Sequence, residues 1–223
     1  RGRHIDISMS EAIFSWLLVL LVVAHETLEV GWTAMRSSVL GAGAAVVAAA
    51  VVLRTSHLPV RIDDSKRLTR TQRERAFHAI LECAETGVGI VCAETIDQRN
   101  ILQATLLAMR EAIQDLPHPP DLILVDGLME PDVPTPCWPL VHGDQRSQVI
   151  GCASIIAKVV RDQLMAFYHQ LDPRYAFHRH KGYGTALHAM RLKAHGPSVF
   201  HRRSFKPVLD AAACWCLLNM ASP

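Results

Sequence analysis

The sequence predicts an α/β fold, because short apolar strands alternate with helical segments along the chain. Two segments support this prediction most directly. Ala44 to Leu53 is a run of small and β-branched residues, which suits a strand buried on both faces of a sheet. Leu122 to Val125 is a shorter apolar strand that ends at the turn signal Asp126-Gly127. At 223 residues, the chain is long enough to bury a substantial core.

The other elements follow from the spacing of apolar residues and from the positions of proline and glycine. Thr95 is a candidate N-cap before Ile96. Proline-rich segments at 117–120 and 131–139 interrupt regular structure. In chain order, the expected elements are a helix over Thr71 to Thr86, a strand over Val88 to Cys92, helices over Asn100 to Leu116 and Val149 to Leu171, and a helix near Thr185 to Ala194.

Positive charge is concentrated near the C-terminal end, although the formal net charge of the chain is only +2. No Asp or Glu occurs between Pro173 and Leu209, a stretch that contains many Lys, Arg and His residues. A basic run is usually a solvated surface. This run is long and includes Tyr175, Tyr183 and Phe205, which favours a polyanionic partner.

The N-terminal region contains a strongly apolar segment, Ala12 to Ala24, that follows Arg1 and Arg3. Thirteen residues are fewer than the roughly 20 that a membrane-spanning helix needs. The length suits the apolar region of a signal peptide, but we favour a buried helix or strand. The six cysteines show no CxxC spacing, so we expect buried thiols in a reducing compartment.

Asp126 is a candidate metal ligand, because a carboxylate at the end of a strand is well placed to meet a ligand in α/β folds. The alternative is an ordinary Asp-Gly turn. Asp162 is a second candidate: with Ser154 and Lys158 it forms one polar stripe on an otherwise apolar helix. A buried carboxylate is costly unless it is paired or bound to metal, whereas a solvent-facing Lys158–Asp162 pair is the simpler interpretation.

Tyr183 lies between two glycines in the segment Arg179 to Thr185. The glycines allow the backbone to approach a sugar or phosphate closely, and the tyrosine ring offers a stacking surface. Neighbouring basic residues such as Lys181 would hold phosphates. The alternative is a glycine-rich turn before a helix that Thr185 caps, and both interpretations can hold together.

Six blocks of this sequence resemble the blocks of bacterial ribonuclease HII, in order and with fitting spacing. The match runs from about Ala45 to Val208. The blocks are DDSKRLT (Asp63 to Thr69), NILQATLLAMREAI (Asn100 to Ile113), LVDG (Leu124 to Gly127), Gly143-Asp144 with Ser147 and then ASIIAKVVRD ending at Asp162, HKGYGT (His180 to Thr185) and HRRSFKPV (His201 to Val208).

The resemblance implies a ribonuclease H-like fold, with a mixed sheet flanked by helices and a helical C-terminal extension that helps to clamp a duplex. It implies endonucleolytic hydrolysis of RNA in RNA–DNA hybrids and at ribonucleotides embedded in duplex DNA, leaving a 3′-hydroxyl and a 5′-phosphate. The cofactor would be Mn²⁺ or Mg²⁺, held by four acidic residues for two-metal catalysis. We expect a cytoplasmic monomer without membrane attachment.

The resemblance also implies roles for individual residues. Asp126 matches the third acidic ligand and Asp162 the fourth, and Tyr183 matches the tyrosine that stacks on the sugar at the ribonucleotide. Lys158, Ser147 and Lys181 are expected to lie along the substrate path. The expected parts of the chain are an apolar extension at 1–29 whose native origin is open, a catalytic domain at 30–172, a basic substrate-clamping part at 173–208, and a tail at 209–223.

The family's first acidic block, of the type Val-Asp-Glu-Ala-Gly-Arg-Gly, is replaced here by Gly31 to Gly43. No Asp or Glu occurs between Val30 and Ile62, so two of the four implied ligands are missing. The chain is either a divergent member or the product of a compensated frameshift, which we favour because the pattern resumes abruptly at Ala45. The leading function is therefore ribonuclease H activity, and the alternative is a catalytically impaired protein that binds RNA–DNA hybrids. An exported or membrane-attached protein is a third hypothesis, which rests on Ala12 to Ala24 alone.

Overall fold

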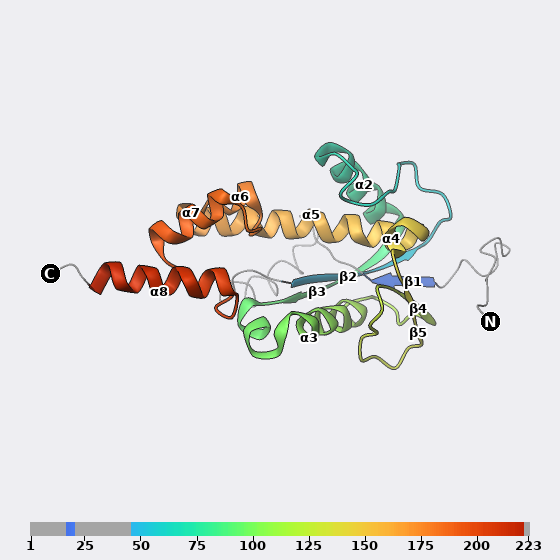
Figure 1. The fold of residues 1–223 in the computed structure, drawn as a ribbon. Coiled ribbons are helices and arrows are strands. Elements are labelled where there is room, and N and C mark those ends of the chain that lie inside the picture. Colours follow the sequence, from blue (N-terminus) through green and yellow to red (C-terminus); the bar gives the residue numbers. More distant parts are fainter. Residues whose placement is uncertain (1–16, 21–45, 221–223) are drawn as a thin grey trace.

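The described part of the chain, residues 17–20 and 46–220 of a computed structural model, is built around one mixed sheet (Figure 1). Its strands lie in the order β3-β2-β1-β4-β5. β1 pairs antiparallel with β2 and parallel with β4, β2 pairs antiparallel with β3, and β4 pairs parallel with β5. The strands are β1 (Leu17–Leu20), β2 (Val46–Leu53), β3 (Ala84–Val91), β4 (Leu122–Asp126) and β5 (Cys137–Leu140).

Helices cover both faces of this sheet (Figure 1). α3 (Ala93–Gln114) lies on one face, and α5 (Gln148–Leu171) lies on the other with α2 (Arg70–Cys83) beside it. The predicted α/β class with a mixed sheet is therefore confirmed. None of the helices in the described residues has the length and hydrophobicity needed to cross a membrane.

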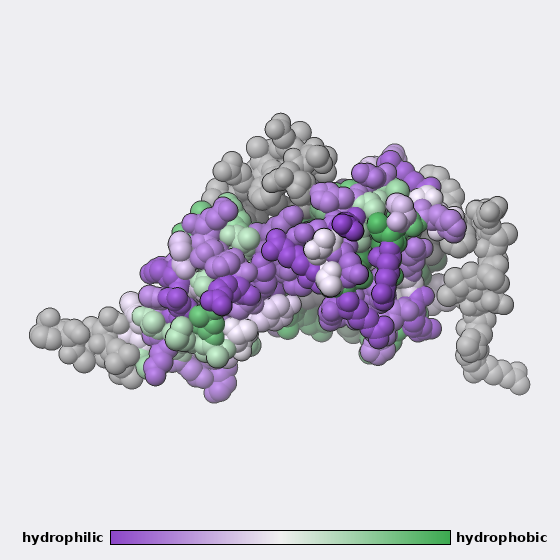
Figure 2. Space-filling model, turned by 90° about the horizontal axis from the view of Figure 1, so that it is seen from above, coloured by the Kyte–Doolittle hydropathy of each residue, from purple (hydrophilic) through white to green (hydrophobic). Residues whose placement is uncertain are grey.

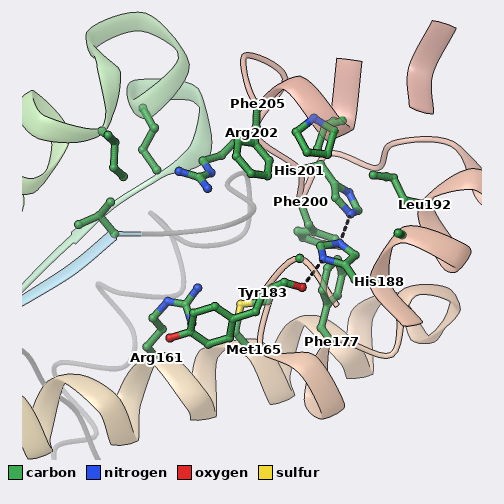
Figure 3. A pocket seen from close by; sticks show the side chains of 18 of the residues that line it. Arg161, Met165, Phe177, Tyr183, His188, Leu192, Phe200, His201, Arg202 and Phe205 are labelled. Carbon is green, nitrogen blue, oxygen red and sulfur yellow. Dashed lines mark hydrogen bonds between the residues drawn. The ribbon is translucent and has the colours of Figure 1, made fainter. Parts of the chain in front are cut away.

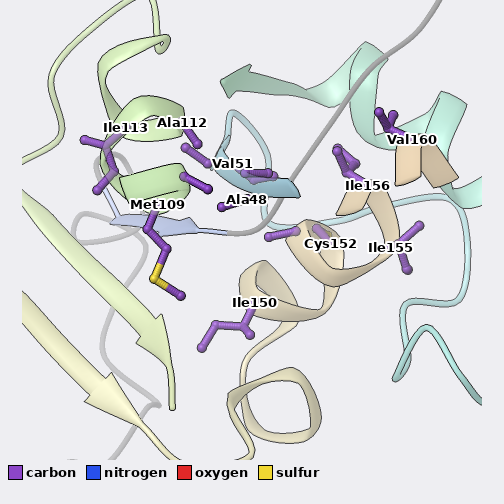
Figure 4. Packing of buried hydrophobic residues seen from close by; sticks show 14 of the residues in the cluster. Ala48, Val51, Met109, Ala112, Ile113, Ile150, Cys152, Ile155, Ile156 and Val160 are labelled. Atoms are coloured by element: carbon purple, nitrogen blue, oxygen red, sulfur yellow. The ribbon is translucent and has the colours of Figure 1, made fainter. Parts of the chain in front are cut away.

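The centre of β2 forms the middle of the core, as its composition predicts. Ala48, Ala49, Ala50 and Val51 are buried, and α3 and α5 pack against β2 from opposite sides (Figure 4). Alanines on α3 and glycines on β3 bring this helix close to the sheet. A Cβ atom on Gly89 would lie only 2.0 Å from the carbonyl oxygen of Ala108, so only glycine fits there.

A second hydrophobic cluster supports the C-terminal region. It joins the far half of α5 to the elements that follow, through Leu164, Met165, Tyr168, Tyr175, Phe177, Leu192, Phe200 and Val208. These elements are η2 (Pro173–Tyr175), α6 (Phe177–His180), α7 (Ala186–His195) and α8 (Lys206–Met220). A helical C-terminal part is thus present, and α8 runs across the expected boundary between residues 208 and 209.

Several element boundaries differ from those predicted. α2 ends at Cys83 and residues 84–86 belong to β3, so the predicted end of that helix at Thr86 is wrong. The N-cap before Ile96 is Cys92 rather than Thr95. Asn100 has a positive φ of 69° and caps the second stretch of α3, because its Oδ1 accepts hydrogen bonds from two following amides. The proline-rich segment at 131–139 also contributes to β5.

The N-terminal apolar segment contributes a strand at Leu17–Leu20, in the middle of the sheet between β2 and β4. We favoured a buried helix or strand for this segment, and these four residues form a strand. The rest of Ala12 to Ala24 lies outside the described residues, as does the replaced motif Gly31 to Gly43.

Candidate metal site and nucleic-acid interface

Asp126 lies at the C-terminal end of β4, where a tight turn leaves the sheet. Gly127 has a φ of 114°, a conformation that favours glycine, and its amide donates to the carbonyl oxygen of Leu140 at 3.1 Å. This bond extends the pairing of β4 with β5 by one step beyond Asp126. The backbone of Asp126 is therefore held by strand pairing, and its carboxylate lies where β4 leaves the sheet.

The short helix α4 (Gly143–Arg146) begins directly against this carboxylate. The amide of Gly143 donates to Oδ1 of Asp126 at 2.8 Å. A Cβ atom on Gly143 would lie 3.2 Å from the same oxygen and 2.3 Å from Cδ1 of Ile150, so a side chain at this position would disrupt the contact. The glycine thereby fixes the position of the next residue, Asp144.

Asp144 is the acidic neighbour of Asp126. Its side chain is only 9% exposed, and its Oδ2 lies 4.0 Å from Nζ of Lys66, which is also 3.6 Å from Oδ1 of Asp64. Burial raises the pKa of Asp126, and the negative charge of Asp144 raises it further, against the Gly143 hydrogen bond and the charge of Lys66. Two carboxylates held together in this way would be stabilised by a cation.

Asp162 lies elsewhere. Ile150, which contacts the Asp126 region, precedes Asp162 by twelve residues on α5. A helix rises 1.5 Å per residue, so this separation corresponds to about 18 Å. Metal–oxygen bonds are about 2.0–2.6 Å long, so one metal site cannot include both Asp126 and Asp162. The structure therefore corrects the expectation that these two residues share a site.

The partners of Asp162 are basic side chains. Nζ of Lys158 donates to its carboxylate, and Nζ of Lys181 donates to its backbone carbonyl oxygen at 3.1 Å. Burial lowers the pKa of Lys181, Asp162 opposes this shift, and the nearby charges of Arg70, Lys158 and Arg161 add to it. Asp162 is thus the acidic member of a basic cluster. The Lys158–Asp162 pair of the simpler interpretation is present, but the stripe does not face solvent, because Ser154 is buried and the two paired side chains are only 23% and 24% exposed.

Tyr183 lies beside that basic cluster and is 56% exposed. Its ring centroid is 4.9 Å from Cζ of Arg161 and 5.8 Å from Nζ of Lys158. The structure therefore brings Tyr183, Lys158 and Lys181 together, whereas Ser147 lies apart, as the N-cap of α5 next to α4. Hydrophilic side chains cover most of the described face that is seen from above (Figure 2).

A cavity of about 700 Å³ opens beside Tyr183 (Figure 3). Arg161, Arg202 and Phe205 line it together with Tyr183, and its inner walls are apolar. Nη1 of Arg161 is buried without a hydrogen-bond partner in the described part of the protein. Burial lowers the pKa of Arg202, and so does the charge of Arg161, against a smaller opposite effect of Asp97. Two guanidinium groups facing one cavity suit an anionic ligand.

Asp97 attaches the Arg202 segment to α3. Its carboxylate accepts hydrogen bonds from the amides of Arg203, at 2.7 Å, and Ser204, at 2.9 Å, as well as from the Ser204 hydroxyl. Burial raises the pKa of Asp97, but these hydrogen bonds and the charge of Arg202 lower it by more, so the pKa lies below its usual value. The segment that contains Arg202 is therefore fixed to the start of α3.

Sequence reasoning missed Asp144, Lys66 and Arg202 as site residues, and it identified Phe205 only as an aromatic member of the basic run. The blocks that contain them stand out in the sequence, but the sequence does not show which member of each block faces a site. The dipeptide Gly143-Asp144 is the sequence feature that could have identified Asp144. A glycine that packs against the end of a strand places the next residue beside that strand end as well. Within the described residues, no group of three or more His, Cys, Asp or Glu side chains is arranged to hold a metal ion.

Comparison with known proteins identifies the family and the fold of this chain. A family model described as Ribonuclease HII matches residues 36–208. The chain is 48% identical over 168 residues to Ribonuclease HII of Chlamydia muridarum (strain MoPn / Nigg), which covers 74% of this chain and 77% of that protein.

Two solved structures show the same fold at low sequence identity. The ribonuclease H2 of Pyrococcus horikoshii OT3 has a TM-score of 0.66 and 19% identity, covering 89% of this chain and 99% of that chain. Bst-RNase HIII in complex with Mn²⁺ has a TM-score of 0.62 and 17% identity, covering 90% and 70%. The ribonuclease H-like fold is thereby confirmed. The chain belongs to the ribonuclease HII family, a family of hydrolases with ribonuclease H-type endonuclease activity.

Proposed function

We propose that this protein acts on RNA–DNA hybrids and on single ribonucleotides within duplex DNA, leaving a 3′-hydroxyl and a 5′-phosphate. The observation that carries the proposal is the pairing of Asp126 and Asp144 at the end of β4, on a chain that also exposes Tyr183 in a basic cluster. The first group suits a divalent cation and the second suits a nucleic-acid backbone.

Asp126 and Asp144 would hold Mn²⁺ or Mg²⁺. Both are hard oxygen donors. Burial, and to a lesser degree the charge of Asp144, raises the pKa of Asp126, and a bound cation would offset both effects. When bound, such ions lower the pKa of the attacking water and stabilise the leaving oxygen in two-metal catalysis. Asp144 takes the place that the sequence resemblance assigned to Asp162.

The residues around the cavity would bind the duplex. The exposed ring of Tyr183 offers a stacking surface for a sugar or base, and Lys158, Lys181 and Arg161 would contact phosphates. The role of Asp162 is to hold Lys158 and Lys181 in place. Ser147 would act on the Asp126 side, by capping the helix that follows Asp144.

A second candidate function is binding of hybrids without cleavage. It is favoured by the absence of Asp and Glu between Val30 and Ile62, which removes two of the four ligands that the family resemblance implies. Losing half of the oxygen ligands of a hard cation should weaken metal binding severely. The basic surface around Tyr183 does not depend on that segment for its charges.

One experiment separates the two functions. The protein is incubated with Mn²⁺ and a DNA duplex that contains one ribonucleotide, and product ends and bound fraction are measured together. The enzyme function is supported if the wild-type protein cleaves the duplex and if Asp126→Asn and Asp144→Asn abolish this cleavage. Asp162→Asn should still show Mn²⁺-dependent cleavage. Binding without cleavage supports the second function, and neither binding nor cleavage contradicts both.

A further inference from the structure

Two histidines behind Tyr183 form a hydrogen-bonded chain that ends on its backbone (Figure 3). Nε2 of His201 and Nε2 of His188 are 3.1 Å apart, and Nδ1 of His188 is 3.0 Å from the carbonyl oxygen of Tyr183. On its other side, Nδ1 of His201 lies 3.1 Å from the amide nitrogen and 2.9 Å from the hydroxyl oxygen of Ser198.

The fixed partners at the two ends determine where the protons are. The Ser198 amide can only donate, so Nδ1 of His201 accepts and the His201 proton is on Nε2. The Tyr183 carbonyl oxygen can only accept, so Nδ1 of His188 carries the proton and its Nε2 is free to accept. His201 therefore donates to His188, and both rings are neutral.

We infer that His201 and His188 are positioning residues that set the place of Tyr183 through this neutral chain of hydrogen bonds. The inference rests on the proposed function, in which Tyr183 contacts the duplex. The carbonyl oxygen of Tyr183 also accepts from the amide of Thr185, and its own amide donates to the carbonyl oxygen of His180, both at 2.8 Å. These two backbone hydrogen bonds lie within the turn itself. The bond from His188 adds a side-chain contact that connects the turn to α7.

The surroundings keep the two rings in place. His180 stacks on His188 with ring centroids 4.2 Å apart, and its own nitrogens bond to the carbonyl oxygen of Tyr175 and to the amide of Gly182. His201 is only 4% exposed, and its ring lies 4.6 Å from that of Tyr175. The chain thus connects the buried part of the C-terminal region to the exposed Tyr183.

Acid should break this chain. A proton added to Nε2 of His188 would point at the N–H of His201 and break the bond between the two rings. A proton added to Nδ1 of His201 would displace the amide of Ser198 as a donor and turn the Ser198 hydroxyl, 2.9 Å from the same nitrogen, into an acceptor. Burial lowers the pKa of both histidines, in agreement with the neutral pair. The other titratable groups that face the pair are His180 and Tyr175, and Asp172, whose charge acts in the opposite direction on His201.

The first test is independent of nucleic acid. Two-bond ¹⁵N–¹H NMR spectra of the full-length protein at neutral pH report which nitrogen of each histidine carries the proton. We expect His188 protonated on Nδ1 and His201 on Nε2. Protonation of His188 on Nε2, or a charged ring at either position, would overturn the inference.

The second test uses two variants of His188 that differ in which bond they keep. Asn places an amide near the position of Nδ1 and can still donate to Tyr183, whereas Gln reaches the position of Nε2 and loses that bond. On a duplex with one ribonucleotide, we expect His188→Gln to bind about tenfold more weakly at neutral pH, in the range of one lost stacking contact. His188→Asn keeps the bond to Tyr183 but loses the bond from His201, so it should bind more weakly than the wild type and more strongly than His188→Gln, and should lose the weakening that acid causes in the wild type.

The outcomes separate the inference from the proposed function. If wild-type protein binds the duplex and the two variants bind equally, His188 does not position Tyr183 and the inference fails. If wild-type protein does not bind the duplex at all, the proposed function fails, and the NMR result alone decides whether the chain of hydrogen bonds exists. Thermal unfolding of both variants checks that the difference in binding does not reflect a loss of folded protein.

Discussion

The amide of Gly143 donates a 2.8 Å hydrogen bond to Oδ1 of Asp126, and this contact determines which second carboxylate joins the site. It holds the start of α4 against the end of β4, so that Asp144, the next residue, lies beside Asp126. Asp162 lies fifteen residues beyond Ser147 on α5. Its carboxylate accepts from Lys158 instead, and its backbone carbonyl oxygen accepts from Lys181. In the proposed function, metal therefore binds beside the N-terminal end of α5, and the duplex binds along the later part of that helix.

Replacing Tyr183 by Ala should weaken binding to a ribonucleotide-containing duplex by about 1–3 kcal/mol, because the stacking surface is lost. Tyr183→Phe retains the ring and should bind within about twofold of the wild type. Fluorescence anisotropy with a labelled duplex, at one fixed salt concentration, measures both variants. Equal affinity of Tyr183→Ala and wild type would exclude the ring from the interface.

Gly89→Ala should destabilise the fold by about 2 kcal/mol or more, because the new Cβ atom would lie 2.0 Å from the backbone oxygen of Ala108 and would push α3 away from the sheet. Urea unfolding followed by circular dichroism measures the change. Gly184→Ala is the matched control: a Cβ atom there would have no atom of the described residues within 4 Å, so the free energy of unfolding should change by less than about 0.5 kcal/mol.

Folding stability should fall as the pH is lowered from 6.5 toward 4. Burial, and to a lesser degree the charge of His188, lowers the pKa of His201 from 6.5 to about 4. The folded state therefore resists a proton that the unfolded chain accepts, so the stabilisation is complete above pH 6.5 and is lost as the pH falls through this window. His201 alone contributes about 3 kcal/mol to this loss.

Urea unfolding at a series of pH values tests this dependence. The control is His201→Gln, which carries no titrating group and should show a shallower decrease in the free energy of unfolding between pH 6.5 and 4.5. An equally steep decrease in the variant would show that His201 titrates normally in the folded protein.

The sequence predicted the regular elements well where periodicity or composition was strong. The buried run in β2 and the apolar face of α5 were located almost to the residue, because a run of small and β-branched residues is typical of a buried strand and 3.6-residue spacing is typical of a helix. Boundaries next to β3 were harder. Its glycines at 87 and 89 look like turn signals in the sequence, but in the structure they make room for α3.

The candidate site was predicted only in part. Asp126 and Tyr183 stand out locally, since one follows a strand and the other lies between glycines. The choice of a second carboxylate depends on a contact between residues 126 and 143 that spacing alone does not show. Asp162 looked suitable because its helix is apolar, yet that helix is long enough to carry it about 18 Å away from Ile150. Lys66 and Arg202 likewise reach their sites only through tertiary packing.

The most direct test of this assignment is Mn²⁺ binding, measured from the electron paramagnetic resonance signal of free Mn²⁺ with wild-type protein and with Asp126→Asn, Asp144→Asn and Asp162→Asn. Each carboxylate that ligates the ion should weaken binding strongly when it is replaced, because hard cations depend on charged oxygen ligands. We predict at least about tenfold weaker binding for Asp126→Asn and Asp144→Asn and no change for Asp162→Asn. Weaker binding in Asp162→Asn, with Asp144→Asn unchanged, would contradict the account.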